Sequence, residues 1–190
     1  MADFHLRSAT IDDLPAINAL IPQSVRALSA ALYTQAQIDS ALRHVFGPDT
    51  RLIEDGTYFV VTTGTQLAAC GGWSRRRTLY GGDQMKAGED SLLDPKTEPA
   101  RIRAFFVAPE FARRGLGSWL LEASLNAAIA AGFHTAELVA TLPGEQLYAA
   151  HGFAKVERVM HALPEGLEIA FVRMRRTLAN GTGSGLGATG

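Results

Sequence analysis

Between an apolar strand and an apolar helix, the sequence reads Val107-Ala108-Pro109-Glu110-Phe111-Ala112-Arg113-Arg114-Gly115-Leu116-Gly117-Ser118. The first N–H groups of a helix have no partner within the helix, and the helix dipole adds partial positive charge beside them. Gly115 and Gly117 would let an anion approach the main chain closely, and Arg113 and Arg114 add two permanent cations. This turn therefore predicts a pocket for a diphosphate.

The turn differs from two common phosphate-binding motifs. A Walker A loop has a lysine directly after its second glycine, whereas Ser118 follows Gly117. Leu120 stands where a dinucleotide fingerprint has its third glycine or alanine. Nucleoside triphosphates and nicotinamide cofactors are therefore disfavoured as ligands.

The segments around this turn have the pattern of a βαβ unit. A strand is expected over 102–107, a helix from about Gly115 to Ala131 that ends at Gly132, and a second strand over 134–140. Such a unit places two parallel strands in one sheet, joined by a right-handed crossover.

Helix-capping and turn residues indicate where the helices and strands of the first 80 residues begin and end. Pro15 suits the first turn of a helix that begins at Ile11, and Thr34 with Gln37 has the spacing of a capping box. Gly64 can supply the positive φ of a hairpin turn. We expect a strand over 4–7, helices from 11 and from 34, and a hairpin with arms 58–61 and 67–70, the second arm extending as far as Tyr80.

After the βαβ unit, the pattern predicts a short helix over 145–151 and two strands, 154–162 and 167–174, that meet at Pro164-Glu165-Gly166. The complete order is then βααββ, βαβ, αββ. Residues 81–97 are polar and rich in turn formers, which favours a long loop inside the domain. We expect a single domain over 1–178 and a flexible, glycine-rich tail over 179–190.

Composition excludes several classes of function. The 190 residues carry a net charge of −1, so no overall basic field attracts nucleic acid or an anionic membrane. No apolar run is long enough to span a bilayer, and the first residues have no signal-peptide pattern. Cys70 is the single cysteine, which we interpret as a small buried hydrophobic residue, and the five histidines have no metal-ligand spacing. A cytoplasmic protein without a metal is expected.

The glycine turn and its surroundings resemble the acetyl-coenzyme A binding motif of the GCN5-related N-acetyltransferase (GNAT) superfamily. That motif is Gln/Arg-x-x-Gly-x-Gly/Ala after an apolar-aromatic-Val-x-Pro run, which appears here as Phe105-Phe106-Val107-Ala108-Pro109. Ala112 replaces the leading Gln or Arg. Tyr148, four residues before Gly152-Phe153, matches a second family feature. The resemblance extends to about Arg176.

The resemblance implies an α/β fold (α+β, mixed sheet) in which helices cover both faces of a central sheet. Acetyl-CoA would be the cosubstrate, and an acceptor amine would attack its thioester directly. Tyr148 would protonate the leaving thiolate, since a phenol is still protonated at neutral pH. The implied cofactor-binding residues, for pantetheine, thioester and diphosphate, are Phe105, Phe106, Val107, Arg113, Arg114, Gly115, Leu116, Gly117 and Ser118.

Several charged residues are candidates for further roles. Glu98 stands where many family members place a carboxylate that accepts the amine proton through water, and Glu137 and solvent itself are the alternatives. Arg101 and Arg103 fall on one face of an otherwise buried strand, so each requires an anionic partner. That partner is either a protein carboxylate such as Glu137 or a carboxylate of the substrate; we favour the substrate, and thus an acceptor such as an amino acid.

The leading hypothesis is an N-acetyltransferase that acts on a small-molecule amine, with neither nucleic acid nor membrane as partner and a homodimer as a possible assembly. One alternative is a non-catalytic regulator that binds acyl-CoA on the same fold. The other is an enzyme that acetylates a protein or peptide amine. Tyr148 favours catalysis, because a pure binder does not require a phenol beside the sulfur.

Overall fold

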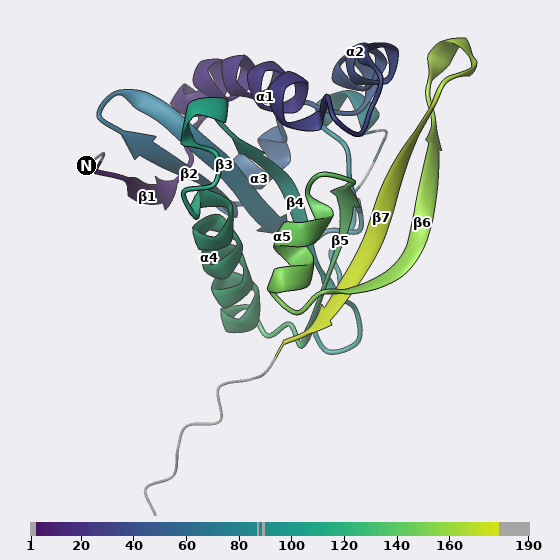
Figure 1. Ribbon diagram of the computed structural model, residues 1–190. Helices are drawn as coiled ribbons and strands as arrows, with labels where there is room; N and C mark the ends of the chain where they lie inside the picture. The colour runs from purple at the N-terminus through teal and green to yellow at the C-terminus, as the bar shows by residue number, and fades with distance from the viewer. Residues whose placement is uncertain (1–2, 87, 89, 179–190) are drawn as a thin grey trace, which may run out of the picture.

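The computed structural model describes residues 3–86, 88 and 90–178, which form a seven-stranded mixed sheet with helices on both faces (Figure 1). The strand order is β1-β2-β3-β4-β5-β7-β6, and only β4 and β5 pair in parallel. The predicted fold class is therefore confirmed. The expected tail over 179–190 lies outside the described residues, and the domain boundary at 178 stays a prediction.

The strands follow the predicted order closely. They are β1 (His5–Ser8), β2 (Tyr58–Thr63), β3 (Gln66–Ser74), β4 (Ala100–Val107), β5 (Thr135–Thr141), β6 (Ala154–Ala162) and β7 (Glu168–Thr177). The hairpin of β2 and β3 turns at Gly64, whose φ is 55°, as expected of a residue without Cβ. β3 ends at Ser74 rather than extending to Tyr80.

The helices include one that the sequence analysis missed. They are α1 (Leu14–Ser29), α2 (Gln35–His44), α3 (Thr50–Glu54), α4 (Leu116–Ala130) and α5 (Glu145–Ala150). The five-residue α3 was not predicted, although Asp49 caps it through a hydrogen bond from the Leu52 amide. A 3₁₀ turn occupies Ile11–Asp13, so α1 begins three residues later than expected, with Pro15 in its first turn.

Neighbouring residues of β2 show how the two faces are covered. Val60 packs in a cluster with Ile17 and Leu20 of α1, whereas Val61 packs against Leu120 of α4. Side chains alternate between the faces of a strand, so α1 and α4 lie on opposite sides of the sheet (Figure 1). Thr34 and Gln37 form the predicted capping box at the start of α2.

Candidate functional site

The site lies where β4 and β5 separate. The registered pairs between these strands are Ala100 with Ala136 and Arg101 with Glu137, although both strands continue beyond them. A bulge interrupts the pairing of β3 with β4, and Ala104 within it has a φ of 57°. The second half of β4 therefore diverges from β5.

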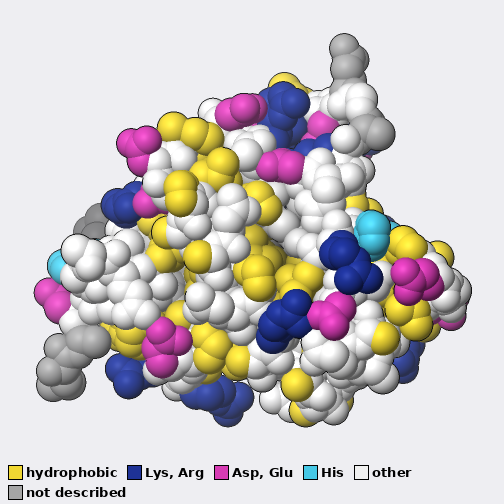
Figure 2. Space-filling view, turned by 90° about the horizontal axis from the view of Figure 1, so that it is seen from above, with side chains coloured by type: hydrophobic (Ala, Val, Ile, Leu, Met, Phe, Trp, Pro, Cys, Tyr) yellow, Lys and Arg dark blue, Asp and Glu magenta, His cyan; other side chains and the backbone are white. Residues whose placement is uncertain are grey.

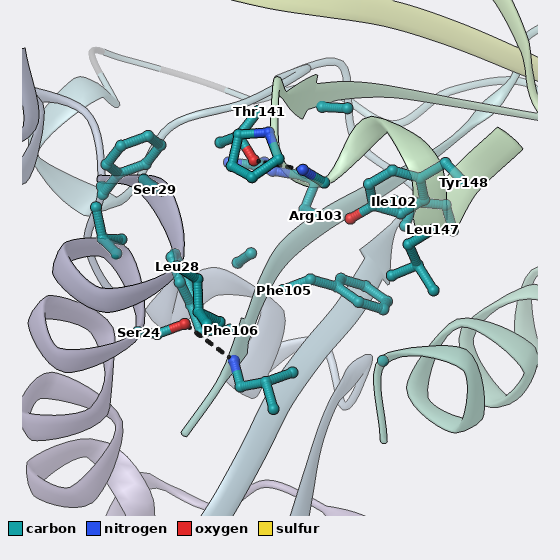
Figure 3. A pocket seen from close by; sticks show the side chains of 18 of the residues that line it. Ser24, Leu28, Ser29, Ile102, Arg103, Phe105, Phe106, Thr141, Leu147 and Tyr148 are labelled. Carbon is teal, nitrogen blue, oxygen red and sulfur yellow. Dashed lines mark hydrogen bonds between the residues drawn. The ribbon is translucent and has the colours of Figure 1, made fainter. Parts of the chain in front are cut away.

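A cavity of about 750 Å³ occupies this region (Figure 3). Its walls come from α1, from β4 and β5, from the glycine turn, from α5, and from the segments 45–47 and 79–82. Phe105, Phe106 and Val107 of β4 all line it, as the resemblance implied. The cavity thus connects the glycine turn with the end of the sheet that carries α5.

The glycine turn opens α4 without a side-chain cap. Gly115 is the N-cap residue, with a φ of 82°, and its carbonyl accepts the amide of Trp119. The amides of Leu116, Gly117 and Ser118 precede the first intrahelical hydrogen bond, and all three residues line the cavity. The helix start therefore presents N–H groups to an anion.

Two arginines stand beside these amides. Arg113 lines the cavity and has a positive φ of 64°, a strained conformation for a residue other than glycine. Arg114 is exposed and lies over the ring of Phe111, 5.6 Å from its centroid. The two guanidinium groups add positive charge to the turn, and its role as a diphosphate pocket stays a prediction.

Gly117 lies close to α5. A Cβ atom at this position would be 3.1 Å from Cδ2 of Leu147, which is tighter than ordinary contact. A side chain here would therefore crowd α5 as well as the space in front of the amides.

Tyr148 projects from α5 toward the cavity (Figure 3). Its ring makes edge-to-face contacts with Phe105 and Phe153, at centroid distances of 6.1 and 6.0 Å. Burial raises the pKa of the phenol well above its usual value. No side chain or carbonyl of the described residues accepts or donates a hydrogen bond at its hydroxyl, so a proton there can be given to a ligand.

The amide of Val107 is engaged by the protein itself. It donates to Oγ of Ser24 on α1, at 3.1 Å (Figure 3). The amide of Val107 is therefore not free in this structure. A ligand carbonyl would have to displace the serine hydroxyl to reach this N–H group.

Neither candidate carboxylate base lines the cavity. Glu98 forms an ion pair with Arg77, at 2.6 Å, and accepts the amide of Asp94. Glu137 is buried and paired with Arg101 and with Arg173, the latter at 2.7 Å. Both carboxylates therefore have protein partners outside the cavity wall.

Arg103 is buried in a network that the sequence analysis missed. Its guanidinium faces Asp49 as an ion pair, at 2.8 Å, and donates to the carbonyl oxygens of Thr78 and Gly81. Asp49 also contacts Lys86. Arg101 and Arg103 thus each have a protein carboxylate, so a substrate carboxylate is not needed to balance either charge, and we no longer favour an acidic acceptor.

Three aromatic rings from distant segments meet at the cavity wall. Phe171 of β7 lies 6.0 Å from Phe46 and 5.8 Å from Tyr80, between ring centroids. The hydroxyl of Tyr80 is 2.9 Å from Nδ1 of His161 on β6. Each ring sits in a different part of the sequence, so no local pattern predicts the group.

Cys70 is fully buried, as expected. Burial raises the pKa of its thiol to about 12, which keeps it protonated and unreactive at neutral pH. Within the described part of the chain, no helix has both the length and the apolar composition that a bilayer span requires.

Comparisons with known proteins agree with the fold. Residues 54–155 match the family model of the acetyltransferase (GNAT) domain. The chain is similar to the solved GCN5-related N-acetyltransferase from Rhodopseudomonas palustris, with a TM-score of 0.67, 18% identity, and 94% of this chain and 98% of that chain covered.

Two further structures of this fold contain the cofactor. The PaiA N-acetyltransferase from Thermoplasma acidophilum, in complex with coenzyme A, has a TM-score of 0.63 and 13% identity and covers 92% of this chain and 99% of its own. YncA from Salmonella typhimurium, with acetyl-CoA, has a TM-score of 0.59 and 12% identity and covers 94% and 96%. A search of curated proteins found no match.

Proposed function

The chain belongs to the GNAT acetyltransferase family, and on this premise we propose that it transfers the acetyl group of acetyl-CoA directly to the amine of a small molecule. One observation carries the proposal: a single cavity joins the amides at the start of α4 to the phenol of Tyr148, through the gap between β4 and β5. A diphosphate at one end and a thioester at the other would fit this arrangement.

The start of α4 would hold the diphosphate. The amides of Leu116, Gly117 and Ser118 would donate to its oxygens, and Arg113 and Arg114 would balance its charge. The absence of a side chain at Gly117 leaves the amides accessible, which supports the fit of this group to the residues present.

The diverging half of β4 would hold the pantetheine and the thioester. Phe105, Phe106 and Val107 line the cavity between the glycine turn and Tyr148. Main-chain N–H groups on this stretch would stabilise the negative charge that develops on the thioester oxygen. The amide of Val107 takes this role only after it leaves Ser24.

Acetyl-CoA supplies the carbonyl carbon that the amine attacks and the sulfur that leaves. The bond between the amine nitrogen and this carbon forms as the carbon–sulfur bond breaks, and Tyr148 gives its proton to the sulfur. The raised pKa of Tyr148 keeps that proton in place until the thiolate develops. Solvent then reprotonates the phenolate.

The amine proton would pass to water. Glu98 and Glu137 are both engaged in ion pairs away from the cavity wall, so neither is positioned to receive it. An apolar cavity also favours the neutral form of an amine over its ammonium form, because burying the charge is costly. The neutral amine would therefore enter after releasing its ammonium proton to solvent, and the second proton, which the nitrogen loses as the amide bond forms, would also pass to water.

Two measurements test the proposal. Thermal unfolding is followed with CoA, acetyl-CoA, NAD and ATP, and we expect stabilisation by the first two only. Thiol release from acetyl-CoA is then measured with small amines and with a peptide that has a free N-terminus. Stabilisation without turnover supports the alternative of a non-catalytic regulator, and turnover with the peptide alone supports acetylation of peptide amines.

A further inference from the structure

The cavity wall is poor in charge. Among the described residues that line the cavity, none is Asp, Glu, Lys or His, and the charged side chains are Arg103 and Arg113. Figure 2 shows hydrophobic side chains in the hollowed middle of the face seen from above, with charged side chains around this hollow. If the acceptor carried a second charged group, these two arginines would be the charged side chains of the cavity wall that it could meet.

Neither arginine is available to an acceptor carboxylate once the proposed diphosphate occupies the glycine turn. Arg103 is almost fully buried, faces Asp49 at 2.8 Å, and uses its N–H groups on the carbonyls of Thr78 and Gly81. Arg113 belongs to the glycine turn, beside the amides that start α4. A carboxylate in the remaining part of the cavity would have no unpaired cation.

The wall around Arg103 is aromatic and aliphatic. Phe171 contacts both Phe46 and Tyr80, and Val25 and Leu28 of α1 line the same cavity. The hydroxyl of Tyr80 is already paired with Nδ1 of His161, so Tyr80 presents mainly its ring. Burial lowers the pKa of His161, which leaves this neighbour neutral at pH 7.

We infer that the acceptor is a primary amine with no other charged group, whose aromatic or branched aliphatic body packs against Phe46, Tyr80 and Phe171. The inference rests on the proposed function and narrows it to one class of acceptor. A second ammonium group would lack a carboxylate, and a carboxylate would lack a cation, so polyamines, aminoglycosides and amino acids would each leave a charge unpaired in an apolar cavity.

Matched pairs of acceptors test the inference with the intact protein. Hexylamine and 1,6-diaminohexane differ by a second amine, and 2-phenylethylamine and phenylalanine differ by a carboxylate. We expect kcat/KM to be higher for the member of each pair that lacks the second charged group, by at least about 100-fold, because a buried unpaired charge weakens binding strongly. The diamine would be the poorer substrate although it carries two reactive groups.

A variant tests whether the aromatic cluster of Phe46, Tyr80 and Phe171 causes the preference for acceptors without a second charge. Phe46→Glu places a carboxylate beside Phe171 and should reduce the preference for hexylamine over 1,6-diaminohexane by at least about tenfold. Val156→Glu is the matched control, because Val156 is exposed on β6 and lies outside the cavity wall. It should leave the ratio unchanged.

The outcomes separate the inference from the proposed function. Equal or better turnover of the diamine or of phenylalanine by the unmodified protein overturns the inference and leaves the acetyltransferase proposal intact. Stabilisation by CoA without transfer to any of the four amines overturns both. Higher kcat/KM for both hexylamine and 2-phenylethylamine, together with the shift in Phe46→Glu, supports the inference. An unchanged ratio in a folded Phe46→Glu protein overturns the role of Phe46, Tyr80 and Phe171.

Discussion

Nη2 of Arg103 lies 2.8 Å from Oδ2 of Asp49, and water is almost excluded from both side chains. Arg103 belongs to β4, whereas Asp49 precedes α3 and also contacts Lys86, so the pair joins three segments that are distant in the sequence. Arg103 further holds the carbonyls of Thr78 and Gly81. The wall of the cavity at this end therefore depends on one buried charge network.

We expect Arg103→Met to destabilise the protein by about 3–5 kcal/mol, because it leaves Asp49 buried with Lys86 as its remaining cation. Urea unfolding followed by circular dichroism measures the change. Arg77→Met is the control, since Arg77 is exposed in its pair with Glu98 and should cost less than about 1 kcal/mol. Equal, small effects of both changes would contradict a structural role for Arg103.

Tyr148→Phe should lower kcat by roughly 10- to 10,000-fold and leave CoA affinity nearly unchanged, because it removes the proton donor and little volume. The decrease in kcat is at the low end of this range if water takes over from the phenol as the proton donor. Tyr33→Phe is the control, because the Tyr33 hydroxyl bonds to Ala170 and Leu142 outside the cavity wall. Steady-state kinetics at saturating acetyl-CoA decide between proton donation and mere packing for Tyr148.

Gly117→Val should abolish stabilisation by CoA, which is about 2.7 kcal/mol for a ligand at a hundred times its dissociation constant. Crowding against Leu147 could contribute, since a Cβ atom at residue 117 comes within 3.1 Å of its Cδ2. The double variant Gly117→Val, Leu147→Ala removes this contact and should still fail to bind. Thermal shifts that return in the double variant would place the diphosphate elsewhere; Leu147→Ala alone should retain them.

The pH dependence of kcat/KM should reveal how the amine loses its proton. If water accepts it, log kcat/KM rises with a slope of one up to the pKa of the free amine, about 10 for an alkylamine. A carboxylate or histidine base would add an inflection at lower pH. The pH profile of kcat/KM is measured with hexylamine and with an amine of lower pKa. An inflection that follows the pKa of the amine indicates proton loss to water, whereas an inflection at the same pH for both amines indicates a base of the protein.

Asp55 should make the free energy of unfolding depend on pH in the acid range. Its bidentate pair with Arg76, at 2.7 and 2.8 Å, lowers the pKa of the carboxyl in the folded protein. The unfolded state then binds more protons in acid, so this contribution is complete above the usual aspartate pKa of about 4 and is lost as pH falls through the lower folded value. Asp55→Asn should therefore destabilise at pH 7, and the difference from the unmodified protein should shrink as pH falls through the lowered folded pKa of Asp55. Urea unfolding of the unmodified protein and of Asp55→Asn at a series of pH values measures this difference.

Local sequence patterns predicted the order of the helices and strands, because most of these elements carry a recognisable pattern within their own residues. The apolar spacing of α4, the capping box of Thr34 and Gln37, and the turn at Gly64 depend on neighbouring residues only. Helix α3 was missed because five residues carry too little periodicity. The bulge at Ala104 was missed because a positive φ at alanine is imposed by the sheet, not by the residue.

The glycine turn and Tyr148 were predicted as site residues from motifs, and both line one cavity. The partner of Arg103 was not found, because the pairing with Asp49 joins positions far apart in the chain. The hydrogen bond from the Val107 amide to Ser24 of α1 likewise depends on how this helix packs on the sheet. Contacts of this kind follow from tertiary packing and leave no local trace in the sequence.

The burial of Cys70 gives the protein an internal reporter of its own integrity. A folded molecule offers no accessible sulfhydryl to a chromogenic disulfide, so every thiol detected during acetyl transfer comes from CoA. An unfolded molecule offers one. The same reagent, added to each variant before acetyl-CoA, therefore counts the unfolded fraction directly and separates a damaged fold from a damaged site.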